Sequence, residues 1–379
     1  MAPHDFRRPF KRAAISDQQR RRELSLQRQA QNRRDAQHQA RCLAQSILSL
    51  QNDSAEPDFE ALPQPEEHAK DFDLRQAARL RGPEARRWFA KQLMLPEWMI
   101  DVPERLNTDW LRNGSLLHRF PSALPNGSRV SNSSRSGQSY CILDCIFHEP
   151  DQIYYVIDMV CWAGMSLYEC TAEFRFFWLN SKLVESGACD DPSTYHRYRF
   201  RAVLVYNCDQ EGLKAAYREP VPYGKDGLLF YNKNAHYQSG NTPLVLVWKD
   251  EICSQYVLDT DSKGQIPDQQ QVVLELCDDG KVATSDDPPT RLEPGNLLRF
   301  ATSEGGLCFA NGKLERADLQ YLGKSNRSRA FADSYSKVMF QYMARRSPLQ
   351  IEHLFESVNS LVEEENAGDT FMFGKKFQK

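Results

Sequence analysis

The 379-residue sequence contains no apolar run that approaches the roughly 20 residues needed to cross a bilayer. Its basic start lacks the apolar core of a secretory signal. The ten cysteines are scattered singly, with no CxxC pair. Four of them lie in apolar, strand-like runs: Cys141, Cys145, Cys161 and Cys170. This pattern indicates reduced buried thiols rather than a zinc site or a disulfide framework. We therefore expect no metal, no cofactor, no membrane partner and a reducing compartment.

Average composition hides a polarised chain. Apolar residues make up 41% and charged residues 26% of the sequence, and the formal net charge is -3, as in an ordinary globular protein. Residues 1–41 nevertheless hold eleven Lys and Arg against four Asp and Glu, whereas residues 53–67 are acidic. Residues 1–50 are thus predicted to be a basic helical arm, and residues 51–82 an acidic, proline-rich linker.

No Gly or Pro interrupts the 35 residues after Ser16, so the arm is predicted to be one helix that Ser16 or Asp17 caps. Its apolar residues are too sparse to predict firm packing on a core: Leu24, Leu26, Ala30, Ala40, Leu43 and Ile47. We expect such a helix to order on an acidic partner, either nucleic acid or an acidic protein groove. A solvated basic tail is the plain alternative.

Residues 83–250 alternate strand-like runs with occasional helices, which predicts an α+β domain with mixed or antiparallel sheets. Strands are expected at residues 140–147, 153–160 and 197–207. The run Thr171–Lys182 predicts a helix that packs its aromatic residues on the sheet and leaves Glu173 and Arg175 outside. Two further strands are expected between Asp226 and Trp248.

The segment Asp226–Trp248, DGLLFYNKNAHYQSGNTPLVLVW, resembles two consecutive motifs of mRNA guanylyltransferases and nucleic-acid ligases, in which a DG strand precedes an apolar strand with WK. This resemblance implies a nucleotidyltransferase-like fold. The chemistry of those enzymes requires a lysine nucleophile upstream of the DG strand. No lysine lies between Lys91 and Lys182, and the carboxylate strand LDGE is matched by Leu143-Asp144-Cys145-Ile146. We therefore expect a nucleotide pocket without catalytic residues.

Six segments in order resemble the snurportin family of trimethylguanosine-cap-binding import adaptors. They are KQLMLPEWMIDVP, HRFPSALP, YCILDCIFHE, YYVIDMVCW, EFRFFWLNSKL and DGLLFYNKNAHYQSGNTPLV. The resemblance implies that a methylated guanine stacks on the tryptophan after the TPLV strand, here Trp248, and that Leu95 and Trp98 line the pocket. For a lone tryptophan such as Trp98, a core position is the plain alternative. Trp248 stands one residue later than the family spacing, and a one-residue slip reverses the face of a strand unless a bulge absorbs it.

A second departure lies after Trp110, where the family has two strands and a basic turn that supplies a phosphate-contacting lysine. This chain has only LRNGSLLH before Arg119. The shortening is compatible with weaker cap binding, with a truncated isoform, or with a compensating role for candidate phosphate contacts at Arg112, Arg129 or Arg135. Arg129 and Arg135 lie in a Ser-, Asn- and Gly-rich loop and are equally compatible with plain solvation.

The arm resembles the importin-β-binding segment of the family, which implies importin contacts at Arg20, Arg21, Arg22, Leu24, Arg33, Arg34 and Arg41. Its charge density leaves a different import receptor open. The resemblance further implies a capped snRNA or snRNP as cargo, an exportin for recycling, and shuttling between nucleus and cytoplasm.

The remaining sequence predicts a β-rich extension at residues 251–322 and a helical tail at residues 323–379, with two helices split by Ser347-Pro348. Two other functions stay open from different classes. One is a scaffold that binds RNA without cap specificity, and the other is a guanylyltransferase- or ligase-like enzyme with a displaced lysine.

Overall fold

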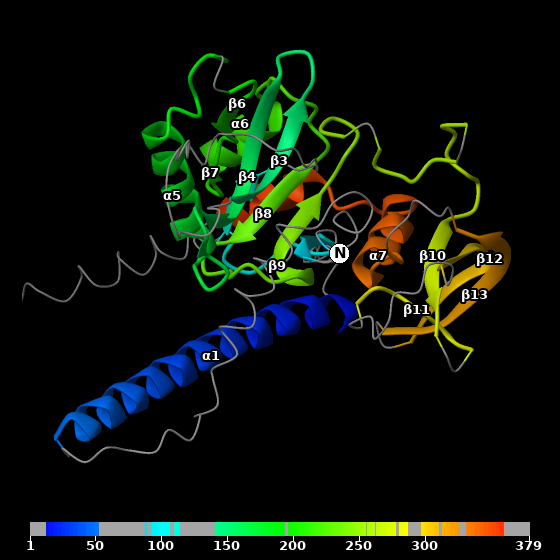
Figure 1. Ribbon diagram of the computed structural model, residues 1–379. Coiled ribbons are helices and arrows are strands. Elements are labelled where there is room, and N and C mark those ends of the chain that lie inside the picture. The colour runs from blue at the N-terminus through cyan, green and yellow to red at the C-terminus, as the bar shows by residue number, and fades with distance from the viewer. Residues whose placement is uncertain are drawn as a thin grey trace, which may run out of the picture.

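A computed structural model describes residues 13–52, 88, 92–106, 110–113, 141–325 and 331–359, with gaps at 194–195, 255, 262, 278–279, 287–296 and 311–312. These residues form three sheets with flanking helices (Figure 1), so the predicted α+β class and the helical arm are confirmed. No helix in these ranges is long and apolar enough to cross a membrane. The linker predicted at 51–82 lies almost wholly outside them. The domain boundaries drawn from the sequence stay predictions.

The central sheet has the strand order β1-β9-β8-β2-β7. Its strands are β1 (Met94–Trp98), β2 (Trp110–Asn113), β7 (Tyr206–Asn207), β8 (Leu228–Asn232) and β9 (Gly240–Trp248). The pair β1–β9 is parallel, and the others are antiparallel. A register shift between Pro96 and Glu97 breaks the regular pairing of β1 with β9.

Alternation along β8 and β9 sends side chains into two different cores. Leu229 and Val245 enter the core that the central sheet shares with the second sheet. Phe230 and Trp248 enter the core on the other face, beneath α6 (Gln210–Arg218) and the helical residues 351–359. The central sheet is therefore covered on both faces.

The second sheet contains β3 (Ile142–His148), β4 (Ile153–Trp162), β5 (Met165–Ser166) and β6 (Arg199–Ala202), with β4 in contact with the other three. The helix α5 (Ala172–Glu185) packs against it, and Thr171 caps the helix by accepting from the Phe174 N–H group.

The predicted orientation of α5 was wrong in part. Arg175, expected outside, is fully buried, and Phe177, expected on the sheet, is 71% exposed. The reason is Asp158 in the middle of β4, which is also fully buried. The Arg175 guanidinium donates from Nε and Nη2 to the two Asp158 carboxylate oxygens, both at 2.8 Å, because a carboxylate in an apolar core needs a partner. Its Nη1 donates to the carbonyls of Cys170 and Ala235.

The arm forms α1 (Ala13–Asn52), a 40-residue helix that runs along one side of the domain (Figure 1). The prediction that it lacks a packing face was wrong for its first half. Gln18, Arg22 and Gln29 are buried, and Leu26 packs against the core shared by the two sheets. Burial lowers the pKa of Arg22 to about 10. Polar side chains, rather than apolar ones, make most of this contact.

The C-terminal third forms a sheet in the order β11-β10-β12-β13. Its strands are β10 (Gln271–Leu276), β11 (Val282–Ala283), β12 (Leu297–Ala310) and β13 (Lys313–Lys324). The helix α7 (Tyr335–Ala344) packs between this sheet and β1, with Val338 and Met339 in a shared core. The β-rich extension expected from the sequence is present, and α7 links it to the central sheet.

Candidate functional site

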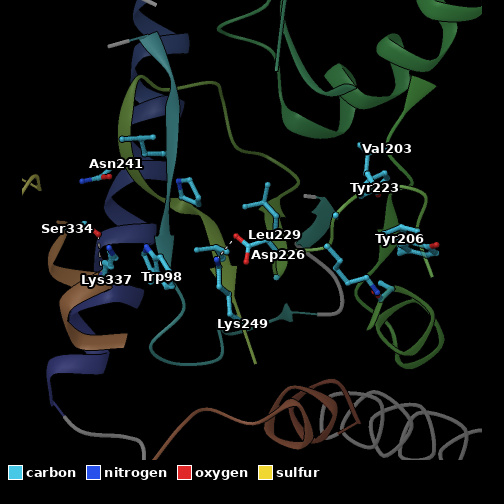
Figure 2. Close-up of a pocket in the computed structure, with 18 of the residues that line it drawn as sticks. Trp98, Val203, Tyr206, Tyr223, Asp226, Leu229, Asn241, Lys249, Ser334 and Lys337 are labelled. Carbon is cyan, nitrogen blue, oxygen red and sulfur yellow. Dashed lines mark hydrogen bonds and ion pairs between the residues drawn. The ribbon is translucent and has the colours of Figure 1, made fainter. Parts of the chain in front are cut away.

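An open cavity of about 470 Å³ lies over one face of the central sheet (Figure 2). One wall comes from β1, β9 and the start of α7, and includes Leu95, Trp98, Val247 and Lys337. The opposite wall comes from the segment around β7 and the turn after α6, and includes Val203, Leu204, Tyr206 and Tyr223. The cavity is apolar and aromatic on both walls, with charged groups at a few positions. Such a site suits a flat ligand with a polar attachment.

The register shift between β1 and β9 accompanies a change in which side chains face the cavity. Trp98 pairs with Val247 of β9, and both line the cavity together with Leu95 and Pro96. Glu97, between them, is 1% exposed and contacts α1 instead. The structure thus places two sequence-predicted site residues, Leu95 and Trp98, at the cavity. Trp98 is half-buried, and it lines the cavity while its ring packs on Phe340.

Trp98 is held from two sides. Its backbone N–H group donates to Ser336 Oγ at 3.0 Å, and its ring lies 4.9 Å from that of Phe340 in α7. Two ammonium groups lie near the ring face, Lys249 Nζ at 5.2 Å and Lys337 Nζ at 5.9 Å from the centroid. In Figure 2 the Trp98 ring lies between these two lysines. The two lysines differ in their carboxylate partners.

Lys249 pairs with Asp226 at 2.7 Å, and Lys337 pairs with both Asp259 at 2.7 Å and Asp333 at 2.9 Å. The stem of Lys249 lies across Gly227, whose φ is +113°. A Cβ at this glycine would lie 2.9 Å from Lys249 Cγ and 2.8 Å from the Trp248 carbonyl oxygen. Only glycine accommodates both this backbone conformation and the close approach of the lysine. The DG turn therefore positions the Lys249–Asp226 pair in the lining of the cavity.

The prediction that Trp248 forms the stacking face of the pocket is corrected by the structure. Its side chain is fully buried on the opposite face of the sheet, its Nε1–H group donates to the Leu349 carbonyl at 2.8 Å, and its ring lies 6.1 Å from that of Tyr217. The physical reason is the one-residue slip noted in the sequence. No bulge in β9 absorbs it against β8, so parity places Val247 at the cavity and Trp248 in the core.

The candidate phosphate contacts have a mixed outcome. Arg112 lies in β2 opposite Tyr206 and Phe230, but its side chain lies outside the described part of the structure, as do Arg129 and Arg135 entirely. These three stay predictions. The cations that the structure brings to the cavity are Lys225, Lys249 and Lys337. The sequence carried a signal for Lys249, because this residue completes the WK motif that follows Asp226-Gly227. Lys337 carries no comparable signal.

The helix α1 is fastened to the strand that supplies Trp98. Arg21 forms a two-pronged ion pair with Glu97, one prong at 3.0 Å, and Gln18 donates to the same carboxylate at 2.8 Å and to the Trp98 carbonyl at 3.2 Å. Burial raises the pKa of Glu97 from its ordinary value, and Arg21 opposes that shift. Farther along, Arg33 donates to the Glu169 carbonyl at 3.5 Å.

The residues predicted to contact an importin are thus divided. Arg21, Arg22 and Arg33 face the domain, whereas the others lie on the exposed side or end of the helix, namely Arg20, Leu24, Arg34 and Arg41.

Asp144, which was matched to the carboxylate strand of the transferases in the sequence, lies beside the buried Asp158 and does not line the cavity. Its carboxylate accepts from the Tyr237 hydroxyl at 2.8 Å and faces Asp158 across β3 and β4. Burial, aided by Asp158, raises the pKa of Asp144 to about 7. Within the described ranges there is no group of three His, Cys, Asp or Glu side chains arranged to hold a metal ion.

In a comparison with known protein families, residues 111–250 match the family model described as the Snurportin1 m3G cap-binding domain, which confirms the predicted resemblance over that segment. The segment contains β8 and β9 but neither β1 nor α7.

Two solved ligase structures show a distant likeness. One is a Lig E DNA ligase, with 13% identity and a TM-score of 0.18, matched over 45% of this chain and 63% of that one. The other is a mycobacterial DNA ligase D complexed with ATP and MES, with 12% identity and a TM-score of 0.19, matched over 48% and 66%. The match spans less than two thirds of either ligase, and such scores carry no argument about fold or activity.

Proposed function

Because residues 111–250 match the snurportin cap-binding family, we propose that this chain binds the trimethylguanosine cap of a small nuclear RNA in the cavity beside Trp98. The observation that supports the proposal most is that Leu95, Trp98, Val247 and Lys249 line that cavity together, with Trp98 paired to Val247 across β1 and β9. A guanine methylated at N7 carries a delocalised positive charge, and two methyl groups on N2 replace hydrogen-bond donors with apolar surface. An aromatic and aliphatic wall with carboxylates nearby suits such a base.

The stacking surface in this proposal is Trp98 rather than Trp248. Stacking of a base on an aromatic side chain contributes about 1–3 kcal/mol. Tyr206 and Tyr223 line the facing wall and add apolar area on the other side of the cavity. The protein acts as an adaptor and not as an enzyme in this reading, since no lysine occupies the position of the transferase nucleophile.

The test is calorimetric titration of the full chain with three ligands: the trimethylguanosine cap dinucleotide, the monomethyl cap and unmethylated GpppG. We expect the trimethyl cap to bind most tightly and Trp98→Leu to weaken it by about tenfold or more. Trp178→Leu is the matched control, because Trp178 is also half-buried beside a lysine, Lys182 at 5.9 Å, but lies on α5 away from the cavity. Equal affinity for all three ligands would reject cap recognition.

Two results would point to the alternatives. A scaffold without cap specificity binds capped and uncapped RNA equally, with affinity that falls steeply as salt rises. A guanylyltransferase- or ligase-like enzyme incorporates labelled nucleotide covalently into the protein.

We further propose that α1 binds an import receptor, either importin-β or another one, and thereby links the bound capped RNA or snRNP to nuclear import. The chain then shuttles between cytoplasm and nucleus, and an exportin returns it to the cytoplasm. The exposed residues Arg20, Leu24, Arg34 and Arg41 support this, since they lie free of the domain surface along a basic helix. Substituting Arg34 and Arg41 by Glu is expected to abolish capture by immobilised import receptor and nuclear accumulation in permeabilised cells. The control is Arg197→Glu, an exposed arginine outside the arm.

A further inference from the structure

Lys249 occupies a position that a cationic base would require. Its ammonium lies 5.2 Å from the centroid of the Trp98 ring and 2.7 Å from Asp226 Oδ2, and the side chain is only 9% exposed. Figure 2 shows Trp98, Lys249 and Asp226 side by side along one wall of the cavity. The Lys249 ammonium therefore already occupies both the face of the Trp98 ring and the Asp226 carboxylate.

An N7-methylated guanine makes the same two demands. Its delocalised charge is attracted to the face of a tryptophan, as an ammonium is, and to a nearby carboxylate. The base and the Lys249 ammonium repel each other, so they cannot share these partners. One of the two cations near Trp98 must therefore move when such a base enters.

Lys249 is the cation that is free to move. Lys337 is held by two carboxylates, Asp259 and Asp333, and its ammonium is farther from the ring, at 5.9 Å. Lys249 has the single carboxylate partner Asp226, which is 44% exposed and also accepts from Ser254. The lysine side chain is a flexible four-carbon stem, so rotation about its bonds can move the ammonium several ångströms toward the cavity mouth without any backbone movement.

We propose that Lys249 exchanges partners when the cap binds, an inference that rests on the proposed function. The methylated base replaces the ammonium at Trp98 and Asp226, and the released ammonium pairs with the cap phosphates. One positive charge leaves the wall and another takes its place, so Asp226 stays neutralised throughout. Lys249 then favours ligands that carry both a cationic base and phosphates. It also supplies the phosphate contact that the shortened segment after Trp110 lacks.

This exchange predicts effects of opposite sign for two ligands. In Lys249→Met the trimethylguanosine nucleoside, which has no phosphates, no longer competes with an ammonium and should bind about two- to fivefold more tightly. The trimethylguanosine cap dinucleotide loses a charge-assisted phosphate contact and should bind about tenfold more weakly. Lys249→Arg keeps the charge, so it should bind the dinucleotide within about threefold of wild type.

The experiment is calorimetric titration of the full chain at neutral pH with the nucleoside, the dinucleotide and unmethylated GpppG. Lys182→Met is the matched control, because Lys182 also lies over a tryptophan, Trp178, and pairs with a carboxylate, Glu185, but lies on α5 outside the cavity. It should leave both affinities unchanged. Thermal melts establish that every variant is folded.

Opposite-sign changes in Lys249→Met, with recovery in Lys249→Arg, support the exchange. Equal weakening of nucleoside and dinucleotide would mean that Lys249 supports the wall in both states, and unchanged affinities would mean that it contacts neither ligand; either result overturns the proposal. If wild type fails to discriminate the methylated ligands from GpppG, the proposed function itself fails. That outcome is distinct, because it is read from wild type alone.

Discussion

Substitution of Trp248 tests whether this tryptophan is a buried core residue, as in the structure, or the stacking residue that the family spacing implies. In Trp248→Phe the buried Leu349 carbonyl loses the Nε1–H donor 2.8 Å away, and a smaller ring leaves a void against Tyr217. An unsatisfied buried carbonyl costs about 1–3 kcal/mol, and the void adds about 1 kcal/mol. We expect the free energy of unfolding to fall by about 2–4 kcal/mol, which is a large part of the roughly 5–15 kcal/mol typical of a domain. Affinity for the cap dinucleotide should stay within about twofold of wild type.

The assay pairs urea denaturation with cap titration, on Trp248→Phe and on its neighbour Val247→Ala. Val247 is only half-buried and faces the cavity, so its truncation should cost about 1 kcal/mol in stability and weaken the cap by a few fold. Trp248→Phe should therefore lose stability and keep its cap affinity, whereas Val247→Ala should keep most of its stability and lose cap affinity. A stable Trp248→Phe protein that no longer binds the cap would refute this assignment and restore Trp248 as the stacking residue.

Three further predictions concern the cavity and the buried cluster. Val247→Trp puts an aromatic ring on the cavity face of β9 and should tighten cap binding by about fivefold or more in calorimetry, whereas weaker binding would mean that the cavity is too narrow for a second ring. Arg175→Leu leaves Asp158 buried without its partner and should lower the urea-derived free energy of unfolding by about 3–5 kcal/mol; a loss under 1 kcal/mol would contradict the pairing. The pKa of Asp144 is about 7 in the folded protein and near 3.9 in the unfolded chain, so the folded state binds this proton more tightly. The stabilisation that results is complete below about pH 4 and is lost as the pH rises to about 7. Asp144→Asn should remove that decline in a series of melts across this range, and an unchanged pH profile would show that Asp144 is not its source.

Strand locations could be predicted from the sequence, whereas the face of the sheet to which each side chain points could not. Apolar runs bounded by turns located β3 and β4 to within about two residues. The side of β9 on which Trp248 lies depends on how that strand pairs with β8 and β1, and this pairing is set by partners far away in the sequence.

The burial of Arg175 and the docking of α1 have a shared cause, because both depend on buried polar groups that a pattern of apolar residues does not reveal. Asp158 inside the run YYVIDMVCW carried a usable signal, because a carboxylate in a buried strand requires a cation from a neighbouring element. The docking of α1 likewise depends on Glu97 and its polar partners Gln18 and Arg21. Those partners lie more than 70 residues away, so no local pattern reveals them.

The cavity joins segments from far apart in the chain, and this has a consequence for how the protein matures. Trp98 and Ser336 are separated by 238 residues and meet through one hydrogen bond, while the family-matched residues 111–250 lie between them. Contacts at such separation form late, since the intervening loop must close first. During synthesis the wall is therefore complete only after α7 has left the ribosome, and a fragment limited to residues 111–250 lacks Trp98 and Lys337. Any ligand that fills the cavity ties the two ends of the fold together, so it should protect β1 and α7 from protease in the same step.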